Sequence, residues 1–446
     1  MNETVLEAPA EMWRSIEEDL LSTPQLERAG VGFAGVVREE AATKLLLRDW
    51  APVPEQEYLV QLAHHLEVSP VFWARAAKRC RSSGEAVVIM HSHPGDPGRP
   101  NFSPSDDAGE ERLIPKMRAR AEVPVGAVVV SLGGSSARLR DGSGPRPMVA
   151  RTVGADPGST SDAPVEETFD RQVRALGREG HAVLRGLRVG VVGAGGLGAH
   201  VVQQLVHLGI GRVVVVDPDR VSASNLSRLV GATRSDVWLR RKKTKVAARL
   251  ARRIGRFTKV TQVSGSVVTR EAAEHLRVCD VIFGCTDNEL SRTVLNVLAF
   301  QYYTPVIDLG VELQLEGAMG GRVAWLSPGG ACLWCMGVLD AERVRVEQLP
   351  PALRKDEEAR GYIRGLDEPA PAVVSINGVV ASLAVTELLA RFTGFAGRSL
   401  RSSLLMYRIA DGTVRRSSPA PRLDCPTCSP AGLLGAEDLA PPPWGV

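Results

Sequence analysis

The sequence predicts an α/β protein with two folded domains, and three observations support this prediction. Its 446 residues exceed the size of one typical domain. Residues 187–228 run through an apolar strand, a glycine-rich turn, a helical pattern and a second apolar strand, which is the order of a parallel βαβ unit. Residues 141–164 are rich in Gly, Pro, Ser and Asp and poor in large apolar side chains, so we expect a flexible linker between two domains.

The composition is that of an ordinary globular protein. A formal net charge of +3 and a hydrophobic content of 44% give no sign of nucleic-acid binding. The N-terminus lacks a signal-peptide pattern and we find no apolar run of membrane-spanning length, so we expect a cytoplasmic protein that does not bind membranes. Seven cysteines, four of them in two Cys-x-x-Cys pairs, fit a reducing compartment and a metal better than a set of disulfide bonds.

The βαβ unit predicts a nucleotide site. Residues 189–192 are short, β-branched and bounded by glycine, as buried parallel strands are. The next helix begins at the turn, where its unpaired N–H groups attract a phosphate. Asp217 ends the second strand, nineteen residues after Gly198, where such units place the carboxylate that binds the ribose. A tight turn without a ligand is the alternative. The turn contains four glycines, Gly193, Gly195, Gly196 and Gly198.

A series of polar residues follows this unit. Asp-Pro-Asp occupies 217–219, Asn-Leu-Ser-Arg occupies 225–228, and Cys-Thr-Asp-Asn occupies 285–288. The series resembles the ubiquitin-activating superfamily in its bacterial ThiF and MoeB-like form. That resemblance implies a Rossmann-like adenylation domain that uses ATP and Mg²⁺ to activate the C-terminal glycine of a ubiquitin-like or sulfur-carrier protein. An NAD-dependent oxidoreductase is the alternative from another class, although it needs none of these later residues.

The same resemblance implies roles for individual residues. Arg228 and Lys245 would bind the triphosphate, and Asp287 would hold magnesium. The segment Phe-Asp-Arg-Gln-Val at 169–173 is similar to the one that opens the family's domain, where an arginine reaches the ATP of the neighbouring subunit, so Arg171 would act in trans within a homodimer. Solvated basic helices and a capping turn are the simpler alternatives. The expected nucleotide-site residues after the glycines are Asp217, Asp219, Asn225, Arg228, Lys245 and Asp287.

The N-terminal part contains a second group of residues, with metal-ligand spacing. Residues 86–90 have the pattern of a short buried strand, and His91 and His93 follow it. Two histidines at i and i+2 point to the same side, and Asp106 can return on the following turn as a third ligand. Three protein ligands leave one position open, as in hydrolytic zinc sites, where the metal lowers the pKa of water to about 7. A pair of surface histidines is the alternative.

This histidine pattern resembles the JAMM (JAB/MPN) metallopeptidases, which cut peptide or isopeptide bonds after the C-terminus of ubiquitin and its relatives. The resemblance implies a catalytic zinc on the three ligands above. It also implies that Ser103 stabilises the oxyanion and that Glu27 is the general base. Glu39 and Glu40 are competing acids at the other end of the strand that follows Glu27.

Two Cys-x-x-Cys pairs predict a further metal site near the C-terminus. Four thiolates complete a tetrahedral zinc site, which is structural because no coordination position stays open. Redox activity of the pairs is the alternative. Residues 336–424 contain no cysteine, although the conjugating members of the resembled family carry a thioester cysteine there, so we expect transfer of the acyl-adenylate to an external acceptor such as a sulfur donor. The four expected ligands are Cys332, Cys335, Cys425 and Cys428.

Together these observations predict a bifunctional enzyme. A JAMM-like α/β domain is expected at 1–145, a linker at 146–165, a ThiF-like domain at 166–430 and a disordered tail at 431–446. The first domain would cleave after the C-terminal glycine of a carrier, and the second would adenylate that glycine. Two alternatives stay open: an isopeptidase that removes the carrier, coupled to conjugation or phage defence, and a non-catalytic adaptor that binds a ubiquitin-like tail. A conjugating enzyme is an alternative partner to the sulfur donor.

Overall fold

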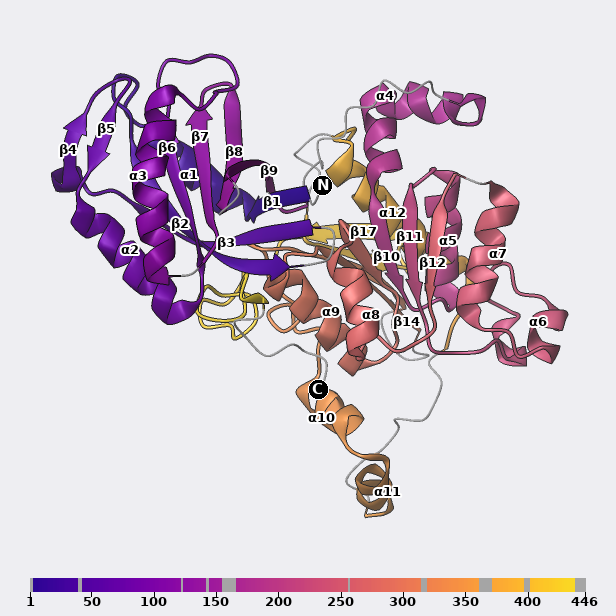
Figure 1. The fold of residues 1–446 in the computed structure, drawn as a ribbon. Coiled ribbons are helices and arrows are strands. Elements are labelled where there is room, and N and C mark those ends of the chain that lie inside the picture. Colours follow the sequence, from indigo (N-terminus) through magenta and orange to yellow (C-terminus); the bar gives the residue numbers. More distant parts are fainter. Residues whose placement is uncertain are drawn as a thin grey trace. The chain divides into compact units, whose positions relative to one another are not determined.

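The polypeptide divides into two units in the computed structural model, coloured along the chain in Figure 1. Unit 1 is formed mainly by Met1–Val153, and unit 2 by Gly154–Phe300 and Thr304–Cys428. Each unit is described by itself. The structure describes residues 3–38, 42–121, 123–141, 144–154, 166–255, 257–313, 319–360, 371–396 and 402–437.

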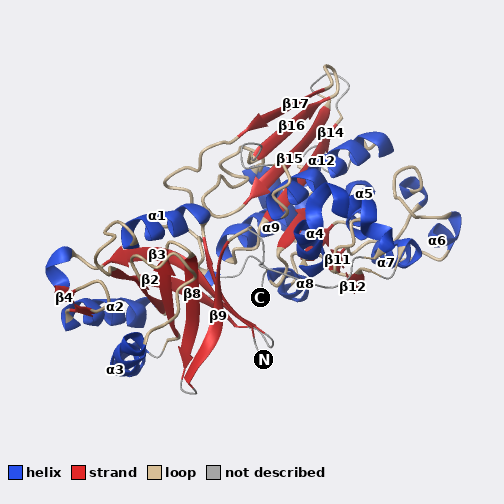
Figure 2. Ribbon diagram, turned by 90° about the horizontal axis from the view of Figure 1, so that it is seen from above, coloured by secondary structure: helices blue, strands red, loops and turns tan. Residues whose placement is uncertain are grey.

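Unit 1 is a closed β-barrel with helices on its outside (Figure 2). Its strands follow the order β1-β3-β2-β6-β7-β8-β9 around the barrel. Apolar residues on the two faces of these strands form two cores, one beneath α1 and the other beneath α2 and α3. The bounds are β1 Glu3–Ala8, α1 Ala10–Leu20, β2 Ala29–Arg38, β3 Ala42–Pro52, β6 Ala86–Ser92, α3 Pro104–Ala121, β7 Val125–Ser131, β8 Gly134–Asp141 and β9 Gly144–Thr152.

The segment at 55–83 follows β3 and ends with helix α2. Its first half forms a β-hairpin of β4 (Tyr58–Gln61) and β5 (Leu66–Val68), after the 3-10 turn η1 (Glu55–Glu57). Helix α2 (Pro70–Ser83) begins only after Ser69, whose side chain accepts a hydrogen bond from the Val71 N–H. A proline at the first helical position and a serine cap set this start.

Two expectations from the sequence are wrong in part: the linker at 146–165 and the disordered tail at 431–446. The linker expected at 146–165 cannot include residues up to 152, because β9 pairs with β8 and with β1 there and buries Met148. Residues 155–165 lie outside the described part of the chain. The tail expected to be disordered at 431–446 is ordered over 431–437. Leu434, Ala436 and Glu437 are buried, and the Arg48 Nε donates to the Leu434 carbonyl at 2.8 Å. Burial and this side-chain hydrogen bond to the backbone therefore hold the segment. Residues 438–446 lie outside the described part of the chain.

Unit 2 contains an eight-stranded sheet in the order β12-β11-β10-β13-β14-β15-β16-β17. The first five strands of this order are parallel, and the last three pair antiparallel. The strand order reverses between β10 and β13, which makes the carboxyl ends of these two strands the expected ligand crevice. The bounds are β10 Arg188–Val192, β11 Arg212–Val216, β12 Lys259–Val263, β13 Val281–Gly284, β14 Val306–Glu312, β15 Gly320–Leu326, β16 Leu404–Arg408 and β17 Thr413–Ser417.

Helices cover both faces of this sheet (Figure 2). Helices α5, α7 and α12 lie over one face, and α8 and α9 lie over the other. The strands predicted at 189–192 and 213–216 and the helix between them are confirmed. The bounds are η2 Glu167–Phe169, α4 Asp170–Gly186, α5 Gly196–His207, η3 Ala223–Asn225, α6 Arg234–Trp238, α7 Lys243–Ile254, α8 Arg270–Arg277, α9 Glu289–Gln301, α10 Ala341–Gln348, α11 Pro351–Ala359 and α12 Val374–Phe392.

Helix α12 corrects one expectation from the sequence. With 19 residues and a mean hydropathy of 1.3 over its best window, it is long and apolar enough to cross a membrane by length and composition. The core helix of a globular domain passes the same test. Here Val380, Ala384 and Leu388 are fully buried in the core of unit 2, and the helix packs on α5 and on β14 and β15.

Candidate functional site

The glycine turn after β10 has the geometry that the sequence predicted. Gly193 has a φ of +90°, and a Cβ there would lie 2.5 Å from the Cys285 carbonyl oxygen. A Cβ on Gly198 would lie 1.8 Å from the Gly193 oxygen. Both contacts exclude a side chain. Helix α5 starts at Gly196, so its first N–H groups open at the end of the strand, where an anion binds favourably.

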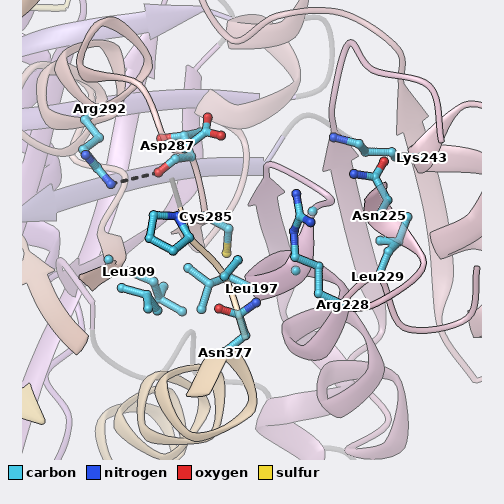
Figure 3. Close-up of a pocket in the computed structure, with 17 residues that line it drawn as sticks. Leu197, Asn225, Arg228, Leu229, Lys243, Cys285, Asp287, Arg292, Leu309 and Asn377 are labelled. Atoms are coloured by element: carbon cyan, nitrogen blue, oxygen red, sulfur yellow. Dashed lines mark hydrogen bonds between the residues drawn. The ribbon is translucent and has the colours of Figure 1, made fainter. Parts of the chain in front are cut away.

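A pocket lies at this turn, at the carboxyl ends of β10, β13 and β14 (Figure 3). It therefore occupies the point where the strand order reverses. Several segments that are far apart in the sequence of unit 2 contribute to it. The lining residues are Gly195, Gly196, Leu197, Asn225, Arg228, Leu229, Lys243, Cys285, Thr286, Asp287, Arg292, Leu309, Gly310, Val311, Pro371, Ala372 and Asn377.

One wall of the pocket carries two cations. Arg228 lies there, and its Nη1 donates to the Ser224 carbonyl at 2.7 Å. The second cation is Lys243, which the sequence did not single out; its Nζ lies 2.7 Å from the exposed carboxylate of Asp219. Lys245, the expected phosphate ligand, is exposed and does not line the pocket. Because α7 begins at Lys243, the two lysines are two positions apart in its first turn and point in different directions.

Asp217 is placed differently from the expected ribose ligand. It is buried and does not line the pocket. One of its oxygens accepts from the Ala194 N–H and the other from the Asp219 N–H, both at 2.7 Å. Burial raises the pKa of Asp217. In this structure its carboxylate therefore fixes the glycine turn and the loop after β11. Asn225 does line the pocket, and its Oδ1 accepts from the Ser222 N–H at 3.1 Å.

The opposite wall carries Asp287 and an arginine that sequence reasoning missed (Figure 3). Asp287 is exposed at the end of β13, as expected. Arg292 lies on α9, and its Nη2 donates to the Thr286 carbonyl at 3.0 Å. Cys285 is a pocket residue as well, and burial raises the pKa of its thiol, which disfavours a nucleophilic thiolate.

Asn377 completes the pocket from α12. A Cβ on Gly196 would lie 2.3 Å from its Nδ2, so this amide packs directly on the glycine turn. The usable sequence signal was an asparagine near the start of a mostly apolar helix. Arg171, the expected trans finger, is exposed on α4 and does not line the pocket of its own chain.

In unit 1 the three expected metal ligands converge. The His91 Nε2 lies 3.0 Å from one Asp106 oxygen, the His93 Nε2 lies 3.3 Å from the other, and the two Nε2 atoms are 3.3 Å apart. Tetrahedral ligands about 2.0 to 2.1 Å from zinc are roughly 3.3 Å apart, so the donor set fits that metal. Burial opposes ionisation of Asp106, but hydrogen bonds from both histidines hold the pKa of this carboxyl well below its usual range.

Strand pairing explains why Glu27 lies beside this cluster. Strand β2 is antiparallel to β6 with Ala29 opposite His91, so the chain entering β2 lies next to the chain leaving β6. Glu27 is buried and lines the same cavity as His91 and Asp106. Burial raises the pKa of Glu27, and the two histidines oppose that rise. The competing acids Glu39 and Glu40 lie outside the described residues.

Ser103 has a structural task in this arrangement. Its N–H donates to an Asp106 oxygen at 2.6 Å, and its Oγ accepts from the Asp106 N–H at 3.2 Å. This reciprocal pair is a capping box at the start of α3, and it fixes the carboxylate that meets the histidines. Because the Ser103 oxygen acts as an acceptor there, its hydroxyl proton stays available as a donor.

The four cysteines of unit 2 also converge. The Sγ atoms of Cys332 and Cys425 are 3.6 Å apart, as are those of Cys335 and Cys428. The close contacts therefore join the two pairs to each other, which favours a shared metal over a disulfide within one pair. Tetrahedral sulfur ligands 2.3 Å from zinc are about 3.8 Å apart, so this donor set fits a structural zinc.

Three known proteins each match between 54% and 59% of this chain. The chain is 30% identical to the SAMP-activating enzyme E1 of Haloferax volcanii over 264 residues, 59% of this chain and 88% of that protein. It is 30% identical to the sulfur carrier protein adenylyltransferase of Thermus thermophilus over 270 residues (59% and 92%). It is 28% identical to the molybdopterin-synthase adenylyltransferase of Escherichia coli over 241 residues (54% and 86%).

Among solved structures, a crystal structure of E. coli MccB with MccA-N7isoASN matches 61% of this chain and 76% of that chain, at 16% identity and a TM-score of 0.48. The model of the ThiF family matches residues 169–428, which include the glycine turn, the pocket and all four cysteines of the Cys-x-x-Cys pairs. The chain therefore belongs to the ThiF family.

Proposed function

We propose that unit 2 adenylates the C-terminal carboxylate of a ubiquitin-like or sulfur-carrier protein. The observation that carries this proposal is the pocket at the strand-order reversal, where a helix N-terminus, Arg228, Lys243 and Asp287 come together. The names of the three relatives support it, because each is an activating enzyme or an adenylyltransferase. Family membership also favours nucleotidyl transfer over the oxidoreductase alternative.

The cations of the pocket would stabilise the negative charge on the phosphates of ATP. In the reaction, a carboxylate oxygen of the carrier attacks the α-phosphorus of ATP, an acyl-adenylate forms, and pyrophosphate leaves. Charge builds up on the leaving phosphates, and the Arg228 and Lys243 cations would offset it. Asp287 would hold the magnesium that accompanies ATP. The acyl-adenylate then passes to an external acceptor, such as a sulfur donor.

Carrier-dependent exchange of pyrophosphate into ATP tests this function. We expect Asp287→Ala to abolish exchange, because it removes the magnesium ligand. Lys243→Ala should lower exchange at least tenfold, a loss typical of one removed charge contact in a phosphoryl-transfer site, whereas Lys245→Ala should have the smaller effect because its side chain lies outside the pocket. Lys243→Ala also removes the ion pair with Asp219, so Asp219→Asn serves as the control for the loss of that pair. A larger loss in Lys245→Ala than in Lys243→Ala would return the phosphate role to Lys245, and full exchange in Asp287→Ala would contradict the assigned site.

The second part of the proposal is that unit 1 is a zinc peptidase that cleaves after the C-terminal glycine of the same carrier. The convergence of His91, His93 and Asp106 at tetrahedral spacing, with Glu27 in the same cavity, supports it. Zinc bound there would supply a Lewis acid. Glu27, whose pKa is raised by burial, would take the proton of the attacking water and pass it to the leaving amine. The Ser103 hydroxyl would donate a hydrogen bond to the oxyanion.

These two activities would act in sequence on one carrier in the cytoplasm. A precursor with residues beyond its glycine should be adenylated poorly by Glu27→Ala or His91→Ala protein. A carrier that already ends in glycine should be adenylated normally by both variants, because the pocket of unit 2 is unchanged. Cleavage should need zinc and no ATP. Equal adenylation of the precursor by wild type and variants would instead favour removal of the carrier from finished conjugates, and an absence of cleavage by the zinc-loaded wild type would favour a non-catalytic adaptor.

A further inference from the structure

The cavity that contains Glu27 and the metal cluster extends well beyond them. It has a volume of about 660 Å³ and runs along α3. The hairpin β4–β5 and the start of α2 form its other wall, with Leu66, Val68 and Trp73 facing it. The hairpin also touches the first turn of α3, where the His65 Nδ1 lies 3.3 Å from the Ser105 Oγ. A long, partly apolar channel therefore leads away from the cluster.

The length of this channel matches a short extended peptide. Helix α3 lines it from Asp106 to Met117. At 1.5 Å per residue, that stretch is roughly 16 Å long. An extended chain rises about 3.3 Å per residue, so about five peptide residues would fill the channel beside α3.

The positive and negative side chains along the channel do not balance. Its carboxylates other than Glu27 have cationic or histidine partners: Glu67 lies 3.4 Å from the His65 Nε2, and Glu110 is paired with Arg138 and Arg140. Arg112 and Lys116 line the same channel from α3 and are exposed, and neither has a carboxylate partner among the residues that the structure describes. The far half of the channel therefore presents two uncompensated positive charges.

We propose that this channel binds an extended peptide segment of the substrate and selects an acidic side chain through Arg112 and Lys116. The inference rests on the proposed peptidase function of unit 1. Arg112 and Lys116 are six and ten residues beyond Asp106, about 9 and 15 Å along the helix. An extended peptide covers these distances in about three to five residues, which places the acidic side chain three to five residues from the bond that is cut. Apolar side chains between them would contact Leu113 and Trp73.

Binding of labelled peptides to the full chain carrying Glu27→Gln tests the inference without cleavage. The probes are fluorescein-labelled ten-residue peptides with a central glycine. Each peptide has a single Asp three to five residues before or after this glycine, and each has a counterpart with Asn in place of the Asp. We expect the Asp peptides to bind about fivefold more tightly than the Asn peptides, as two partly exposed ion pairs allow. The preference should weaken as salt increases. Double replacement by Arg112→Glu and Lys116→Glu should abolish it and favour peptides with Lys in place of Asp.

Arg118→Glu is the matched control, because Arg118 lies on the same helix and does not line the channel. It should keep the preference for Asp, and thermal unfolding of all variants would verify that they fold. Equal affinity for Asp and Asn peptides, or no saturable binding at millimolar concentration, would overturn the inference. Cleavage by the zinc-loaded wild type without any preference for Asp would overturn the inference and leave the peptidase function standing. A preference for Asp in binding, without cleavage by the zinc-loaded wild type, would support the channel and remove the peptidase function.

Discussion

At the scale of single residues, Asp236 shows how a buried charge shapes the nucleotide pocket. Its side chain is fully buried, and both oxygens accept from Arg249 at 2.6 Å. Arg241 lies 3.0 Å from the same carboxylate, and Arg249 also donates to the Gly231 carbonyl. This network ties the segment between η3 and α7 to α7 itself. Because Arg228 and Lys243 lie at the two ends of that segment, the network supports the cationic wall of the pocket.

We predict that Asp236→Asn lowers the free energy of unfolding by roughly 3 kcal/mol at pH 7, because it removes the buried charge that pairs with the partly buried guanidinium groups of Arg241 and Arg249. Hydrogen bonds from Arg249 hold the pKa of Asp236 below its ordinary value of 3.8. The carboxylate therefore stabilises the fold fully above about pH 4, and this contribution is lost as the pH falls through the lower folded pKa. Urea unfolding of the wild type and of Asp236→Asn should show that the difference between their free energies of unfolding becomes smaller below pH 4.

The pair of Asp219 and Lys243 provides the comparison, because its carboxylate is exposed. Asp219→Asn should change stability by less than about 1 kcal/mol, since an ion pair whose carboxylate is exposed to solvent contributes little. A similarly small change in Asp236→Asn would show that the buried network does not hold this segment.

At the scale of elements, the two Cys-x-x-Cys pairs join loops that are far apart in sequence. Cys332 and Cys335 follow β15, and Cys425 and Cys428 follow β17. Three of the four side chains are buried. A metal here would close a long loop, so binding would be coupled to the folding of this part of unit 2.

We predict two zinc ions per chain by elemental analysis. Replacing Cys332 and Cys425 by serine should remove one ion and lower the melting temperature, because it breaks the bridge between the two loops. Replacing His91 and His93 by alanine should remove the other ion from a protein that remains folded and still adenylates. One ion in the wild type would mean that one of the two donor sets holds no zinc.

At the scale of the whole molecule, the position of Arg171 bears on assembly. It is exposed on α4 and does not line the pocket of its own chain. The role expected for Arg171, reaching the ATP of a neighbouring subunit, therefore requires a second chain. This requirement is the basis for the homodimer expected from the sequence.

We predict that Arg171→Ala lowers pyrophosphate exchange and that mixing it with Asp287→Ala restores part of the activity. In the mixed dimer, one pocket keeps its own Asp287 and receives Arg171 from the partner. Native mass spectrometry should first verify that the subunits exchange. If they exchange without any rescue, the site is complete within one chain.

Features set by neighbouring residues could be predicted from the sequence. The strand at 189–192, the glycine turn and the helix after it depend on local spacing and on the absence of a Cβ, and the structure confirms them. The same holds within each His-x-His or Cys-x-x-Cys motif, because side chains at these short separations lie close together in any compatible fold. The approach of Asp106 to the histidines, and of one cysteine pair to the other, depends on the tertiary structure.

Features set by distant contacts were decided only by the tertiary structure. The first turn of α7 places Lys243 rather than Lys245 on the pocket. The Asp217 carboxylate accepts hydrogen bonds from two backbone N–H groups, so it points toward the glycine turn and away from the pocket. Asn377 reaches the pocket from a helix far along the chain. The order at 431–437 likewise depends on burial and on a bond from Arg48. Sequence spacing determines which groups are near neighbours along the chain, but packing between remote segments determines which way each side chain points.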